Sequence, residues 1–242
     1  MMKFFSIILL QLLSMNYCYS QTHNIVGVFP TLNLKYDLSE KISVESYSFL
    51  SVLPIEKTID NVEYPSHSGA LYSELDFTYK VNSKFSLTGS YTYERVNPFE
   101  NNYRNENRIW LQGTLESKFK NWKVKNRIRY DLRFINNRST NETDFNPRAR
   151  YLFGLSKPLR VKENSPVFSI YNEVFFNTFK DASAFYGENW FFSGIGFSLT
   201  RQTKIEVGYL NIAWVRDQSK NWLMQHFGQV TLTIDLTKAK KE

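Results

Sequence analysis

Cysteine, histidine and long apolar runs are all scarce in this sequence. The single cysteine among the 242 residues is Cys18, and it lies in a segment that is typical of an export signal. Lys3 supplies the positive charge of such a signal, and Phe4 to Leu13 form its short apolar segment. We therefore expect residues 1–20 to be a signal peptide.

A lipoprotein signal that modifies Cys18 is the rival interpretation of the same segment. Tyr17 is bulky where such signals carry a small residue, which favours ordinary cleavage after Ser20. Cleavage there removes the only cysteine, so residues 21–242, expected to form a single domain, would have no disulfide, thiol nucleophile or thiolate metal ligand.

Outside the first twenty residues, no apolar run is long enough to form a membrane-spanning helix. The formal net charge of +7 falls by one if Lys3 is removed with the signal. The remaining positive charge is spread along the chain, which is not the concentrated basic patch of a nucleic-acid-binding protein. We therefore expect no nucleic-acid partner.

The three histidines are His23, His67 and His226. Lipid hydrolases of the outer membrane need a histidine within hydrogen-bond reach of a serine hydroxyl. His67 lies between Ser66 and Ser68, whereas His226 has no such neighbour in the sequence. A lipid-modifying hydrolase is therefore the alternative function. No catalytic residue is assigned, and no metal or cofactor is expected, because no cluster of histidines and carboxylates has ligand spacing.

The sequence is rich in long alternating runs, most clearly at residues 108–119 and 123–134. Apolar and polar side chains alternate there with a period of two, which indicates strands with one apolar and one polar face. Strands in globular proteins usually have about five or six residues, whereas a tilted strand that crosses a bilayer needs roughly 9–11. Aromatic residues make up 17% of the chain, and membrane barrels use them at their interfaces. These features predict a transmembrane β-barrel with a polar interior.

The same alternation predicts strands along the rest of the chain, with connections that are alternately short and long, except at 158–165. Bacterial outer-membrane barrels have this asymmetry and usually an even number of strands. Because eleven strands are counted, we expect residues 22–29 to add a twelfth to an all-β, antiparallel, up-and-down barrel; ten strands is the alternative. The eleven predicted strands lie within residues 31–38, 42–53, 71–81, 85–94, 106–119, 123–134, 148–157, 167–177, 188–199, 204–215 and 229–236.

By its Glu106-Asn107-Arg108-Ile109-Trp110 run and its Arg127-x-Arg129-x-Asp131-x-Arg133-Phe134 run, the chain resembles the domain of unknown function 2490 family of Gram-negative bacteria. Asp131 stands where the family usually has Glu, and Trp190 where it usually has Arg. The resemblance implies an outer-membrane β-barrel and supplies no activity. It continues through Arg148, Arg150, Tyr151, Asn172, Glu173, Asn189, Gly194, Gly196, Gly208, Tyr209 and His226.

With the apolar faces outward, the three strands between residues 106 and 157 place eight cations and three anions inside the barrel, and the other strands place three cations and nine anions there. A simple register sets Glu116 opposite Arg127, and Asp131 opposite Arg150, close enough for ion pairs. The predicted lumen charge network comprises Glu106, Arg108, Glu116, Arg127, Arg129, Asp131, Arg133, Arg148, Arg150, Glu173 and Glu188.

Two interpretations of these charges remain open. In the first, they pair across a filled interior, because a lone buried charge is costly. In the second, they line a wet lumen whose transverse field orients small polar solutes. The sequence therefore predicts an outer-membrane barrel, in contact with outer-membrane lipid, that is structural or a narrow pore. A lipid hydrolase is the alternative, and a soluble secreted β-barrel is third.

Overall fold

The computed structural model describes residues 22–59, 62–64, 68–161, 164–179, 185–215 and 222–237, and every regular element in these ranges is a β-strand. None of the described residues belongs to a helix that could cross a membrane. The expected signal peptide, residues 1–20 with Cys18, lies outside the described residues. The strands are β1 (Thr22–Asp37), β2 (Ile42–Val52), β3 (Lys57–Ile59), β4 (Val62–Tyr64), β5 (Ser68–Lys80), β6 (Phe85–Val96), β7 (Arg104–Phe119), β8 (Trp122–Asn137), β9 (Glu142–Phe145), β10 (Arg148–Pro158), β11 (Val167–Asn177), β12 (Tyr186–Ser198), β13 (Thr203–Val215) and β14 (Trp222–Asp235).

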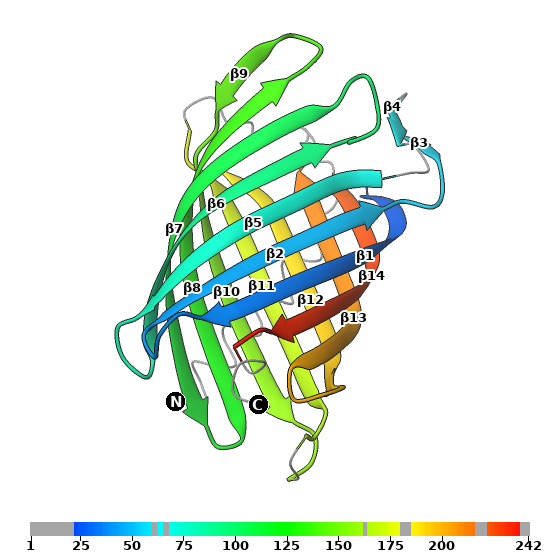
Figure 1. Ribbon diagram of the computed structural model, residues 1–242. Helices are drawn as coiled ribbons and strands as arrows, with labels where there is room; N and C mark the ends of the chain where they lie inside the picture. The colour runs from blue at the N-terminus through cyan, green and yellow to red at the C-terminus, as the bar shows by residue number, and fades with distance from the viewer. Residues whose placement is uncertain are drawn as a thin grey trace.

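A closed barrel is formed by eleven of these strands (Figure 1). Each strand pairs antiparallel with the next one around the barrel, in the order β1, β2, β5, β6, β7, β8, β10, β11, β12, β13 and β14. The barrel closes where β1 and β14 pair in parallel, from Thr22 beside Trp222 to Lys35 beside Asp235. The barrel is therefore mixed rather than purely antiparallel.

The expectation of twelve strands, or of ten, is wrong. Residues 22–29 do not form a separate strand, because the chain runs through Pro30 and the whole segment is β1. Pro30 has no N–H to donate, and the register between β1 and β2 passes from Val28 directly to Thr31. An up-and-down chain with an odd number of strands starts and ends in the same direction, so its closing pair must be parallel.

Short strands lie in two of the connections between the predicted strands. The segment after β2 contains the β3–β4 pair, and the connection after β8 contains β9, which extends the end of β8 beyond its pairing with β10. The last strand also begins at Trp222, earlier than expected. Both additional elements lie at the top of Figure 1, at the end of the barrel with the long connections.

The side chains of the barrel follow the predicted alternation. On β7, Leu111 is 72% exposed on the outside, whereas the neighbouring Trp110 is 1% exposed on the inside. On β8, Ile128 is exposed and Asp131 is fully buried. The outer wall is thus apolar and exposed, and the charged side chains of these two strands face inward.

Part of the interior is filled by apolar side chains, which we call the aromatic cluster. Phe29 and Phe49 have ring centroids 4.3 Å apart, and Phe49 stacks on Tyr72 at 4.5 Å. Phe192 lies over Gly194 and Gly208, where a Cβ atom would come within 2.6 Å of its ring. The cluster comprises Ile25, Phe29, Phe49, Leu53, Tyr72, Phe192, Leu210, Ile212, Leu223 and Phe227, with Tyr47, Ala70, Tyr171 and Trp190 packed against it.

Candidate functional site: the charged lumen

A cavity of about 1120 Å³ lies inside the barrel. Its lining includes Arg104 and Asn177 from the end with the long connections, and Ser83 and Lys84 from a short turn at the other end. Charged side chains from most of the barrel strands face it. The candidate functional site is therefore the lumen itself.

One group of ion pairs lies towards the long connections and is centred on Glu106. This carboxylate is fully buried and accepts hydrogen bonds from Arg133 Nε at 2.5 Å and Arg133 Nη2 at 2.9 Å. Arg108 donates both to Glu106 and to Glu94 on β6. Both oxygens of Glu106 are thus engaged by guanidinium groups, which makes these charge-assisted hydrogen bonds strong.

A second group is centred on Asp131, which is also fully buried. Its Oδ2 accepts hydrogen bonds from Arg148 Nε at 3.2 Å and from Arg150 Nε at 2.5 Å. Arg148 also donates to Glu188 at 2.9 Å, which links β8, β10 and β12. Phe175 lies beneath both arginines, 4.6 Å from Arg148 Cζ and 4.8 Å from Arg150 Cζ.

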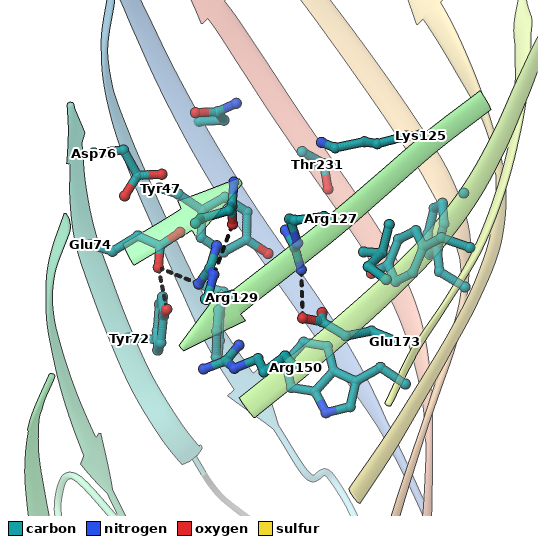
Figure 2. A pocket seen from close by; sticks show the side chains of 18 of the residues that line it. Tyr47, Tyr72, Glu74, Asp76, Lys125, Arg127, Arg129, Arg150, Glu173 and Thr231 are labelled. Carbon is teal, nitrogen blue, oxygen red and sulfur yellow. Dashed lines mark hydrogen bonds and ion pairs between the residues drawn. The ribbon is translucent and has the colours of Figure 1, made fainter. Parts of the chain in front are cut away.

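Two further ion pairs lie closer to the short turns (Figure 2). Arg127 contacts Glu173 at 2.6 Å, which joins β8 to β11. Arg129 lies 3.5 Å from Glu74 and donates to Gln112 at 2.9 Å. Ten of the eleven predicted residues therefore take part in ion pairs that link the walls of the lumen, and we call these pairs the charge network.

Glu116, the eleventh, does not join the network. It lies opposite Lys125 rather than Arg127, and its ion pair is with Lys123 at 2.8 Å, at a more exposed position. The connection after β7 is a two-residue turn in which Lys120 has a φ of 53°, so the register differs from the predicted one. Asp131 likewise lies opposite Arg148 rather than Arg150, and reaches Arg150 as a diagonal neighbour.

The aromatic side chains that support the arginines were not predicted as part of the site. Trp110 lies 3.5 Å from Arg129 Cζ, and Tyr72 lies 5.5 Å from Arg108 Cζ. Trp110 also donates to Thr92 at 2.9 Å. One signal was present in the sequence, because Trp110 occupies an inward position between Arg108 and Gln112.

His226 lies on the outer wall, because the residues on either side of it face the lumen. Its Nδ1 is 2.5 Å from the Tyr209 hydroxyl and its Nε2 is 2.9 Å from Asn24 Oδ1. Neither contact is the serine hydroxyl that a hydrolase needs. His23 is in β1, and His67 lies outside the described residues. Within those residues, no group of three potential ligands is placed to hold a metal ion.

The fold and the lumen define a class of protein: a closed, eleven-stranded β-barrel with an apolar outer wall and an interior crossed by ion pairs. The model of the family described as "Protein of unknown function (DUF2490)" matches residues 28–223, and the chain belongs to that family. No curated protein and no solved structure gives a significant match.

Proposed function

We propose that this protein is an outer-membrane β-barrel whose lumen is a narrow polar pore, restricted by the charge network and the aromatic cluster. The observation that carries the proposal is the contrast between the two faces of the wall. Leu111, Ile128 and Phe77 are 72%, 66% and 55% exposed on the outside, whereas charges face the lumen. A contiguous apolar surface of this kind is rare on a soluble monomer and typical of a lipid-facing wall.

Aromatic side chains near both ends of the barrel support the membrane part of the proposal. Towards the short turns, Trp122 packs edge-on against Phe168 at 6.4 Å, and Lys157 lies over the same indole ring. Towards the long connections, Tyr186 and Trp222 have centroids 5.7 Å apart. Tryptophan and tyrosine favour the two membrane–water interfaces.

The size of the lumen supports a narrow pore rather than a wide channel. Eight strands leave room only for side chains or one small ligand, and sixteen enclose an open channel. Eleven strands lie between these limits, and buried ion pairs and stacked rings occupy much of the cross-section. The cavity nevertheless includes lining residues from both ends of the barrel.

Single-channel recording of the purified, refolded protein in planar bilayers tests this proposal. We expect a conductance well below that of a sixteen-stranded porin. Phe49→Ala combined with Tyr72→Ala removes two stacked rings from the lumen and should raise the conductance. The matched control Leu111→Ala changes only the outer wall and should leave it unchanged. Absence of current from both the parent and the widened variant would exclude a pore, and solubility without detergent would exclude a membrane barrel.

A further inference from the structure

The lumen between the charge network and the short turns contains carboxylates that lack ion-pair partners. Glu45 on β2 and Asp76 on β5 are directly opposite each other in the register, and both line the cavity. Neither has an ion pair within the described part of the chain, and Asp76 Oδ1 is buried without a hydrogen-bond partner. Lys35 on β1 is the other register neighbour of Glu45, but its ion pair is with Asp37 at 3.6 Å. Directly opposed like charges destabilise a sheet, so Glu45 and Asp76 would be stabilised by an additional cation.

Two cations of β8 in the same part of the lumen have side-chain nitrogens without a partner. Lys125 lines the cavity opposite Glu116, whose ion pair is with Lys123, and has neither an ion pair nor a hydrogen bond to any described residue. Arg127, two residues further along, contacts Glu173 through Nη2, but its Nε is buried without a partner. Figure 2 shows Lys125 and Asp76 on opposite sides of the pocket.

One neutral side chain adds an acceptor beside the carboxylates. Asn33 on β1 also lines the cavity, with an unpartnered Oδ1 atom. Asn33 is directly opposite Tyr47, two residues from Glu45, and β1, β2 and β5 are consecutive in the barrel. The oxygens of Asn33, Glu45 and Asp76 therefore form one group of neighbouring acceptors. Buried polar atoms are normally hydrogen-bonded, so such a set points to a missing partner.

We propose that this chamber binds a small zwitterion with an ammonium group at one end and a carboxylate at the other. The ammonium group lies against the acceptors Glu45, Asp76 and Asn33, and the carboxylate against Lys125 and Arg127. An uncharged polyol would supply neither a cation to Glu45 and Asp76 nor an anion to Lys125, and a lone cation would leave Lys125 without an ion-pair partner. This assignment rests on the proposed pore and names the class of solute that its lumen takes.

Equilibrium binding to the full-length, detergent-folded protein tests the assignment by calorimetry. The probes are glycine, 4-aminobutanoate and 6-aminohexanoate, which separate the two charges by increasing lengths. The singly charged controls are the alkanoates and alkylammonium ions of matching length. We expect at least one amino acid to bind about tenfold more tightly than both of its controls, which is the effect of one additional satisfied charge.

Substitutions separate the two ends of the ligand. Lys125→Gln should reduce the affinity for the amino acid to that for the alkylammonium ion, and Asp76→Asn should reduce it to that for the alkanoate. The control Lys157→Gln, which alters a lysine that lies over Trp122 and does not line the cavity, should leave the affinity unchanged. Heat-dependent gel mobility identifies the variants that have folded, and the comparison of probes on the parent protein needs no variant.

Equal binding of an amino acid and one of its controls, no binding to the folded parent, or an unchanged affinity in folded Lys125→Gln would each overturn the assignment. Because calorimetry requires no ion current, the two proposals fail separately. A barrel that conducts ions but binds no amino acid would support the pore and exclude the zwitterion site. A barrel that binds the amino acid but conducts no ions would support the zwitterion site and exclude the pore.

Discussion

Asp131 illustrates how single residues hold the lumen together. Its carboxylate is fully buried and lies between two guanidinium groups. The attraction between these three charges offsets the free-energy cost of removing them from water, and does so only while all three are present. Glu106 has the same role towards the long connections, where it binds Arg108 and Arg133. Each central anion therefore holds two arginines in place, at least one of them on a neighbouring strand.

Asp131→Asn should destabilise the folded barrel by about 3 kcal/mol, because it keeps the shape of the side chain but leaves Arg148 and Arg150 without their shared anion. Arg150→Gln is the matched control and should cost less, since Asp131 then retains Arg148. Urea unfolding of the refolded proteins in detergent measures both. A larger loss for Arg150→Gln would show that Asp131 is not the centre of this group.

At the scale of single residues, the sequence predicts which face of the sheet a side chain occupies, but not which residue it contacts. A period of two is enough to place Asp131, Arg148 and Arg150 inside the barrel. Which residues are opposite each other depends on how many residues each turn contains. The two-residue turn after Phe119 places Glu116 opposite Lys125 rather than Arg127. The inward position of Trp110 is visible in the alternation, but its contact with Arg129 of the next strand depends on the register between the two strands.

At the scale of one strand, β5 offers adjacent residues on opposite faces. Phe77 is 55% exposed on the outer wall, whereas Thr78 lines the cavity and lies 2.9 Å from the Thr88 hydroxyl. These two positions differ in environment but not in distance along the barrel, which makes them a matched pair.

Phe77→Arg should therefore impair assembly, because a cation on the lipid face costs roughly 2–4 kcal/mol at the middle of the bilayer and less towards its edges. Thr78→Arg should be much milder, because its charge enters the polar lumen. The fraction of protein with heat-modifiable mobility, measured in outer-membrane extracts, reports both. Equal tolerance of the two arginines would argue against a lipid-facing wall.

The pairing of β1 with β14 gives a second test at the element scale. Asn33 and Thr233 are register partners, so Asn33→Cys with Thr233→Cys should form a disulfide on mild oxidation. Lys35→Cys with Thr231→Cys is four residues out of register, about 13 Å, and should remain reduced. Gel mobility under non-reducing conditions distinguishes the two. Cross-linking of the second pair alone would contradict the parallel register.

The number of strands could be counted from the sequence, but the way they close could not. Alternation predicted eleven strands, and only the preference for even numbers raised the expectation to twelve. Pro30 resembled a boundary because proline usually interrupts a ladder, yet β1 continues through it beside β14. The partner that permits this lies some two hundred residues away in the chain, beyond the reach of any local signal.

At the scale of the whole molecule, the two ends of the barrel should face different compartments. The connection at residues 97–103 belongs to the end with the long connections, and the turn at residues 81–84 belongs to the opposite end. Outer-membrane barrels direct long loops to the cell exterior and short turns to the periplasm.

Asn101→Cys should therefore react with a membrane-impermeant maleimide on intact cells, whereas Ser83→Cys should react only after the outer membrane is permeabilised. Both positions are exposed in the structure, so accessibility within the protein does not distinguish them. Labelling of Ser83→Cys alone on intact cells would reverse the proposed orientation.

The parallel pairing of β1 with β14 also has a consequence for how the molecule forms. Antiparallel neighbours such as β7 and β8 meet across a two-residue turn, whereas Phe29 and Phe227 meet only after nearly the whole chain has been ordered. Contacts between such distant segments form slowly, because the entropy of closing the intervening chain must be lost first. The barrel should thus pass through an open, curved sheet whose two free edges are β1 and β14, and the aromatic cluster should become complete only when those edges join.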